Sequence, residues 1–289
     1  MIAALRILAE AATYRLGRLE MANIFAGLTI AVALGMSSFE TLVRVLFLFL
    51  LNVLALLGND CFDVDQDVVS RHRDPAKPSF LKAHMKEAVA AQIALGLALA
   101  AFALFWSRGL LIVFVLGEGN CLLYSWRLKR VAFLDVLSIA LWGLVMPAAC
   151  FPLDSALGWC LSLQLFFFSA TFELMQVMRD REEDLRHGVT TTAVRLGHRG
   201  SVLFLRIVLM ASAAYGILFI HRFVGIGILA ALLLPVRQGD EARAWTRLRV
   251  VLGLVWLVLV GWILVKGETY GLVTGVSVED TIAWMTVVR

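Results

Sequence analysis

The sequence predicts an all-α integral membrane protein with a bundle of nine transmembrane helices. Of its 289 residues, 61% are hydrophobic and 17% are charged, whereas a soluble domain has roughly 45–50% and about 25%. The apolar runs are continuous and long enough for helices, which excludes the alternating pattern of a membrane β-barrel. Because each crossing uses about 20 apolar residues, no room remains for a soluble second domain. We therefore expect one domain over 1–289.

Nine apolar runs lie between charged or Pro/Gly-containing segments, and each predicts one helix. They cover 21–38, 40–58, 88–106, 109–126, 132–151, 157–178, 201–220, 223–236 and 250–266. The eighth run is short for a full crossing, and the fourth is interrupted by Glu118, Gly119 and Asn120. The segment before the first run, residues 1–20, carries charges around a weak apolar stretch, which favours an interfacial segment over a cleaved signal.

The positions of Lys and Arg predict the orientation in the membrane. If the N-terminus is cytoplasmic, most of the 26 basic residues fall in segments on the cytoplasmic side, as the positive-inside rule requires. This rule also accounts for the net charge of +4, so we expect the lipid bilayer as a partner and no nucleic acid. The four cysteines form no CxxC pair, so neither a disulfide framework nor a zinc site is indicated. We expect a multi-pass protein of the cell membrane.

Two predicted cytoplasmic loops, about 59–87 and 179–200, are longer and more polar than the others and contain clusters of acidic residues. Read as continuations of the preceding helices, each cluster places its oxygen ligands on one helical face. The first face holds Asn59, Asp63 and Asp67, with Asp60 beside them, and the second holds Glu173, Gln176, Asp180 and Asp184. Stacked like charges repel, and hard oxygen ligands without His or Cys favour Mg²⁺ bound together with substrate phosphates.

A simpler interpretation of such clusters is available. A run of acids in a cytoplasmic loop is usually a solvated surface, and for a single cluster we would favour that interpretation. Two clusters, each aligned on a helical face at the same side of the membrane, favour a site that holds a diphosphate through magnesium ions.

The first cluster, Asn59-Asp60-x-x-Asp63-x-x-x-Asp67, resembles the first aspartate-rich motif of the UbiA superfamily of intramembrane prenyltransferases. Asp180-x-x-x-Asp184, followed by Gly188, Thr191 and Gly197, resembles the second motif. The resemblance extends over nearly the whole chain. It includes Tyr124 and the basic pair Lys129-Arg130, which look like the family's tyrosine and basic segment.

The resemblance implies a central cavity within the helices, capped by the two polar loops on the cytoplasmic side. It also implies a prenyl diphosphate donor held by Mg²⁺ and a lipophilic acceptor, which in the family is usually aromatic. Asp63, Asp67, Asp180 and Asp184 would then be the catalytic metal ligands, assisted by Asn59, Asp60 and Glu173. The candidates that grip phosphate oxygens or line the substrate site are Asn59, Arg71, Arg73, Lys77, Tyr124, Lys129, Arg130, Phe172 and Gln176.

Three features depart from the family pattern. Glu173 stands where many members have Asp, and Gln176 where many have Tyr. The segment that follows Asp67 also differs from the arginine-proline ending of quinone-pathway members. These departures concern the acceptor more than the metal site.

Glu118 has three further interpretations, because a carboxylate inside an apolar span is costly and usually faces a cavity or a partner. It is either the partner of Arg44 or a residue near the acceptor pocket, and the third option is that the boundary of this span is misplaced.

Other functions remain as alternatives. An ion-coupled transporter would need acids near the bilayer midplane, where only Glu118 lies. Within the superfamily, terpene cyclisation and phosphoribosyl transfer to a polyprenyl phosphate stay open.

Overall fold

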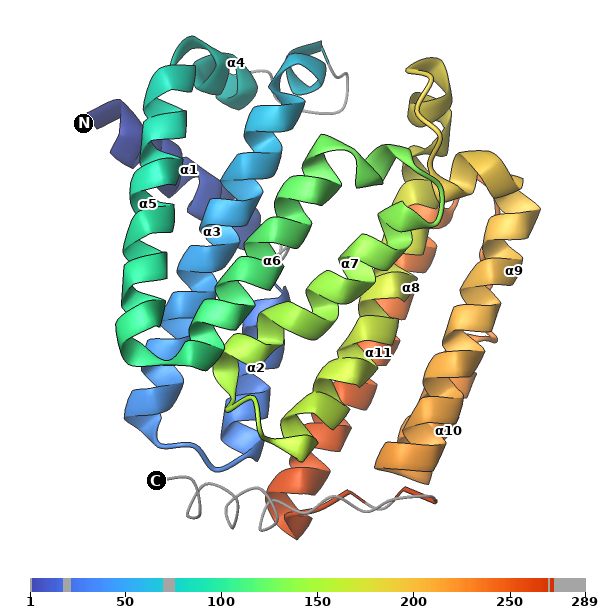
Figure 1. Ribbon diagram of the computed structural model, residues 1–289. Coiled ribbons are helices and arrows are strands. Elements are labelled where there is room, and N and C mark those ends of the chain that lie inside the picture. The colour runs from blue at the N-terminus through green and yellow to red at the C-terminus, as the bar shows by residue number, and fades with distance from the viewer. Residues whose placement is uncertain (1, 18–21, 70–75, 270, 273–289) are drawn as a thin grey trace.

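The chain forms a bundle of long helices that run alongside one another, and the all-α prediction is confirmed (Figure 1). The computed structural model describes residues 2–17, 22–69, 76–269 and 271–272. In chain order, the elements are α1 (Ile2–Gly17), α2 (Ala22–Ala33), α3 (Ser38–Val69), α4 (Ala76–Ala83), α5 (Met85–Trp106), α6 (Arg108–Trp126), η1 (Leu128–Arg130), α7 (Leu134–Val145), η2 (Met146–Cys150), α8 (Ala156–Arg186), α9 (Thr192–Tyr215), the π-helical turn η3 (Gly216–Ile220), α10 (Arg222–Ala231) and α11 (Glu241–Lys266).

Within the described residues, six helices are long and apolar enough to cross a membrane. They are α3, α5, α6, α8, α9 together with η3, and α11. Three shorter apolar helices, α2, α7 with η2, and α10, accompany them. Each predicted apolar run coincides with one of these helices, which supports a multi-pass membrane protein. Nine full crossings stay a prediction.

The bundle is held together by apolar side chains that recur at helical spacing. In α3, Leu48, Leu51 and Ala55 are at most 1% exposed and follow one another every three or four residues. The packing of α7 on α8 depends on Gly143, because a Cβ at this position would lie 2.0 Å from the hydroxyl oxygen of Ser169. This close contact brings α7 against the helix that carries the second acidic cluster.

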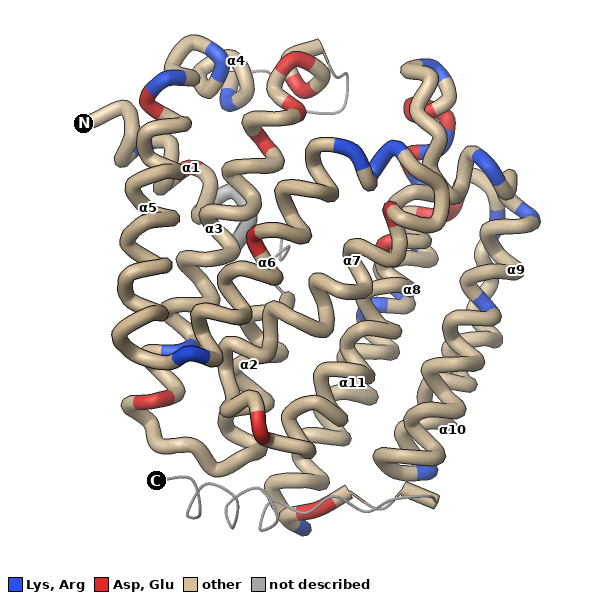
Figure 2. Tube along the Cα trace, in the orientation of Figure 1, with Lys and Arg blue, Asp and Glu red and all other residues tan. Residues whose placement is uncertain are grey.

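The two acidic clusters lie on helical extensions rather than in loops. α3 has 32 residues and α8 has 31, so at 1.5 Å per residue each is longer than 40 Å, whereas the hydrocarbon core of a bilayer is about 30 Å thick. Figure 2 shows acidic and basic residues gathered at the end of the bundle where α3, α6 and α8 project. The polar segment at 76–83 is helical as well, since it forms α4.

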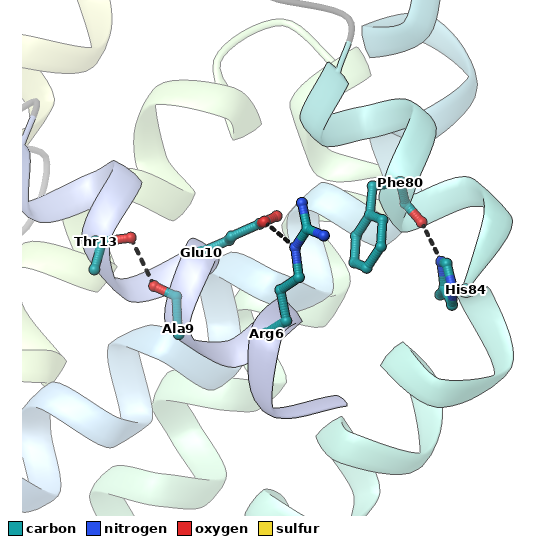
Figure 3. Close-up of polar contacts among 6 residues, drawn as sticks. All are labelled: Arg6, Ala9, Glu10, Thr13, Phe80 and His84. Carbon is teal, nitrogen blue, oxygen red and sulfur yellow. Dashed lines mark hydrogen bonds and ion pairs between the residues drawn. The ribbon is translucent and has the colours of Figure 1, made fainter. Parts of the chain in front are cut away.

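The N-terminal helix α1 packs against α5 and α3 and contacts α4 through Arg6. Ile7 and Ala11 are buried in a small apolar cluster with Leu57, Val64 and Leu81. Arg6 donates to Glu10 at 2.6 Å, and its guanidinium lies 4.1 Å from the ring centre of Phe80 (Figure 3). α1 therefore braces the region from which the first acidic cluster emerges.

Arg44 does not pair with Glu118, so this sequence-based interpretation is wrong. The Arg44 guanidinium donates to Glu40 one helical turn away at 2.9 Å and to the carbonyl oxygen of Ala149 at 3.2 Å. Glu118 Oε2 is buried and has no hydrogen-bond partner within the described part of the chain.

Candidate active site

A cavity of about 700 Å³ lies at the end of the bundle where the two acidic helical extensions emerge. Its walls come from α3, α6, η1, α8, the connection from α8 to α9, α9 itself, and the segment that leads into α11 with the start of that helix. The predicted site residues that line it are Asp63, Asp67, Tyr124, Lys129, Arg130, Glu173, Gln176, Asp180 and Asp184. The two helical faces inferred from the sequence therefore border one space.

On the α3 side, a lysine from a distant part of the chain pairs with one carboxylate of the first acidic cluster. Lys129 Nζ of η1 contacts Asp63 Oδ1. Both side chains are largely withdrawn from solvent, with 15% and 17% exposed. A short 3₁₀ turn directly after α6 holds Lys129 and Arg130 at the cavity wall. Cations and carboxylates therefore meet at this wall.

On the α8 side, the acidic residues have partners close in sequence. Arg179 donates to Asp180 through two nitrogens, at 2.7 and 2.8 Å. Thr191 Oγ1 donates to Asp184 Oδ2 at 3.2 Å.

Deeper in the bundle, Glu173 is 3% exposed and accepts a hydrogen bond from the Tyr124 hydroxyl at 3.0 Å. This bond links α6 to α8 and provides a polar floor beneath the carboxylates.

Several predicted site residues lie away from the cavity wall. Asn59 Oδ1 accepts a hydrogen bond from Ser125 Oγ at 3.0 Å. Asp60 is 5% exposed and pairs with Lys77 of α4 at 2.9 Å. Phe172 packs against the hydrophobic core. Arg71 and Arg73 lie outside the described residues.

The cavity also contains residues that the sequence analysis did not select. Gln66 lies three residues after Asp63, so its helical phase was a usable signal. Arg181 lines the cavity, and its Nε is buried without a hydrogen-bond partner among the described residues. His198 Nδ1 lies 3.4 Å from Glu241 Oε1. The sequence carried no sign of this contact, because α9 and α11 meet only in the folded chain.

The donor set suits a hard divalent cation. Carboxylate oxygens from two helices border the cavity, and oxygen ligands are those that Mg²⁺ prefers. The described residues contain no preformed group of three or more His, Cys, Asp or Glu ligands. In proteins, Mg²⁺ is usually bound by one or two carboxylates together with substrate phosphates. Asp63, Asp67, Asp180 and Asp184 are thus suitable ligands once an anionic substrate supplies the rest.

Comparisons with known proteins agree with this architecture. The sequence profile described as the UbiA prenyltransferase family matches residues 21–237. The chain is 29% identical over 184 residues to digeranylgeranylglyceryl phosphate synthase of Pyrococcus abyssi, and this match covers 59% of the chain. The match spans only 61% of that relative's length.

Solved structures share the fold at low sequence identity. A structure described as concerning digeranylgeranylglyceryl phosphate synthase in membranes has a TM-score of 0.70 at 16% identity, covering 90% of this chain and 99% of the other. A UbiA homologue from Archaeoglobus fulgidus, bound to GPP and Mg²⁺, has a TM-score of 0.57 at 17% identity and covers 91% and 98%. The apo structure of a UbiA homologue from Aeropyrum pernix K1 gives 0.58 at 19% identity, covering 85% and 97%.

Proposed function

We propose, on the premise that the chain belongs to the UbiA prenyltransferase family, that it is a Mg²⁺-dependent intramembrane prenyltransferase. Its donor would be an allylic prenyl diphosphate, and its acceptor a lipophilic molecule from the bilayer. One observation carries the proposal: the carboxylates of α3 and α8 and the basic pair of η1 border a single cavity at the end of an apolar bundle. A diphosphate needs both cations and metal-binding oxygens, whereas its prenyl chain needs apolar surroundings.

Acidic and basic residues of the chain would have different roles in binding the diphosphate. Asp63, Asp67, Asp180 and Asp184 would hold Mg²⁺, which when bound supplies the positive charge that makes the diphosphate a better leaving group. When the donor binds, Lys129 would leave Asp63 and contact a phosphate oxygen. This rearrangement would free the Asp63 carboxylate to bind Mg²⁺ and would neutralise part of the charge on the diphosphate.

The reaction then follows from the charges. The allylic C–O bond breaks, its electron pair leaves with the diphosphate, and the carbon becomes a delocalised cation. A nucleophilic atom of the acceptor forms the new bond to this carbon and loses its proton. Basic side chains stabilise the charge that develops on the diphosphate. Arg130 is suited to this role, since a guanidinium can make two parallel contacts with phosphate oxygens.

Two acceptor classes follow from different observations. The family resemblance favours an electron-rich aromatic ring. The similarity to the Pyrococcus abyssi synthase favours a glyceryl phosphate lipid, whose nucleophile would be a hydroxyl oxygen. The first gives a C–C bond and the second an ether, so the product distinguishes them.

The test is to incubate the purified protein with labelled geranyl, farnesyl and geranylgeranyl diphosphate and a panel of phenolic, quinolone and lipid-alcohol acceptors. We expect a prenylated product that requires Mg²⁺, disappears with EDTA and returns when Mg²⁺ is restored. Product formation in chelator would contradict the metal proposal. A product made from the donor alone would instead indicate cyclisation.

We further infer that the acidic helical extensions face the cytoplasm of a cell-membrane protein. The supporting observation is that most Lys and Arg residues lie on this side of the bundle. A cysteine introduced near Gly200 should react with an impermeant reagent only from the cytoplasmic side. Labelling from outside intact cells would overturn this orientation.

A further inference from the structure

A buried carboxylate outside the predicted motifs connects the start of α7, just after the basic pair of η1, to the start of α9. Asp135, in the first turn of α7, is fully buried. Its Oδ2 accepts from the Thr192 backbone N–H at 2.7 Å, and its Oδ1 accepts from the Thr192 hydroxyl and from the Val136 N–H. The Thr192 hydroxyl oxygen in turn accepts from the Phe133 N–H at 2.7 Å. A buried carboxylate is costly unless it is hydrogen-bonded in this way.

Asp135 caps α9 from another helix. The first N–H groups of a helix have no partner within it, and a side-chain oxygen of the preceding residue usually satisfies one of them. Here that residue is Thr191, whose side chain does not cap the helix. Its hydroxyl donates to Asp184 instead, and Asp135 accepts the N–H of Thr192. Asp135 thus leaves Thr191 available to hold a proposed metal ligand.

The same short region borders the basic pair. Lys129 and Arg130 lie six and five residues upstream of Asp135, and the chain between them forms a parallel bridge from Val131 to Thr190. Phe133 has a φ of 71°, a left-handed conformation that is uncommon for a bulky residue. The hydrogen bond from its N–H to Thr192 fixes the turn at this point. One network therefore joins the basic segment after α6 to the connection that follows Asp184.

We propose that Asp135 is a positioning residue that sets the distance between the phosphate-gripping segment, Lys129-Arg130, and the second acidic cluster. It does not itself line the cavity, and it acts through Thr192 and Thr191. The inference rests on the proposed function, because it assigns the network to metal and diphosphate binding rather than to folding alone.

The test measures binding, so it does not depend on turnover. Mn²⁺ serves as the probe, and its binding in the presence of inorganic pyrophosphate is followed by electron paramagnetic resonance in detergent. The first variant is Asp135→Asn, in which an amide NH₂ replaces one of the carboxylate oxygens that accept hydrogen bonds from Thr192 and Val136. The second is Thr192→Val, which removes the side-chain hydroxyl. Thr192→Ser keeps the backbone N–H and a side-chain hydroxyl, so it should restore the Mn²⁺ binding that Thr192→Val weakens. The matched control is Ser138→Ala, because Ser138 is a buried polar residue one turn further along α7 that bonds to Asn120 of α6.

We expect Asp135→Asn to raise the Mn²⁺ dissociation constant about 10–100-fold, as is typical when a residue that orients metal ligands is changed. Thr192→Val should have a smaller effect, and Thr192→Ser and Ser138→Ala should bind as the unaltered protein does. Hydrogen exchange over residues 187–192 should accelerate in Asp135→Asn and Thr192→Val only.

Equal Mn²⁺ binding in Asp135→Asn, Thr192→Val and the unaltered protein would overturn this inference alone. A lower Tm of Asp135→Asn with unchanged binding would assign the network to folding and overturn it as well. If the unaltered protein bound no Mn²⁺ with pyrophosphate, the proposed function would fail first, and the inference with it. Should Asp135→Asn not fold, the contrast between Thr192→Val and Thr192→Ser decides.

Discussion

The two acidic helical extensions face one cavity but are held in different ways. The α3 extension is tied to its surroundings by ion pairs to lysines of other elements, Lys129 to Asp63 and Lys77 to Asp60. On the α8 extension, Asp180 pairs with its sequence neighbour Arg179, whereas Asp184 and Glu173 accept hydrogen bonds from Thr191 and Tyr124. We expect the first arrangement to exchange partners when an anion binds, and the hydrogen-bonded part of the second to keep its geometry.

This difference suggests a division of roles. The Lys129–Asp63 pair is largely withdrawn from solvent, and breaking such a pair without a replacement is costly. We therefore expect Lys129 to leave Asp63 only when a phosphate oxygen and a metal ion take over the two charges. Buried hydrogen bonds are costly to break, so we expect the α8 side and the Asp135 network to keep their geometry when the donor binds. We expect substitutions on the two sides to differ in which property they damage.

The largest expected effect is the loss of turnover when either cluster loses its central carboxylate. Asp63→Asn and Asp180→Asn should each lower kcat/KM by about 10³-fold or more, which corresponds to about 4 kcal/mol on the barrier. The reason is that each removes a proposed metal ligand while preserving volume. Steady-state assays with a labelled prenyl diphosphate would measure it.

The matched control for both variants is Asp154→Asn. Asp154 is an exposed acid just before α8, at the end of the bundle away from the cavity, so full activity is expected. Normal activity in Asp63→Asn or Asp180→Asn would remove that cluster from the metal site. Activity lost in only one of them would show that the metal depends on a single wall.

A smaller loss of activity is expected when the basic partners of the two clusters, Lys129 and Arg179, are replaced. Lys129→Met should lower kcat/KM for the diphosphate about 100-fold, because a phosphate oxygen loses its cation. Arg179→Met should cost about tenfold or less, because the Arg179 guanidinium is paired with its neighbour Asp180 and stacked 5.4 Å from the Trp245 ring centre. Titrations of the diphosphate for both variants provide the comparison. A larger loss in Arg179→Met would reverse the roles assigned to the two walls.

Helical periodicity predicted much of the fold and part of the site. The apolar runs located the helices, and the spacing of Asp63 and Asp67 on α3, and of Glu173 and Asp184 on α8, placed their side chains along one cavity. Such arguments succeed because a single helix fixes the directions of residues three and four apart.

Helical periodicity could not predict contacts between segments that are distant in the sequence. Asp60 belongs to the first motif by spacing, yet the position of α4 pairs it with Lys77 away from the cavity. Thr191 was noted as part of the second motif, but spacing did not predict that its hydroxyl would donate to Asp184 while Asp135 of another helix accepts the Thr192 N–H. The pairing of Arg44 with Glu118 failed for a different reason, because Glu40 lies one turn away on the same helix and its i, i+4 spacing already offered Arg44 a partner. Sequence spacing does not report which helix will lie opposite.

The smallest expected effect concerns the two lysines of α4, Lys77 and Lys82, and tests whether Lys77 stabilises the fold or binds phosphate. Lys77 and Lys82 both lie on α4 and both pair with acids of α3, but Asp60 is buried and Asp65 is 80% exposed. Lys77→Met should therefore lower the Tm by a few degrees, because a buried carboxylate loses a cation. Lys82→Met should leave it unchanged, as exposed ion pairs contribute about 0–1 kcal/mol. Both variants remove one charge from the same short helix, so a general loss of positive potential affects them equally. If Lys77→Met were stable but inactive, Lys77 would contact the diphosphate after all, and the α3 side would bind the donor through α4 as well as η1.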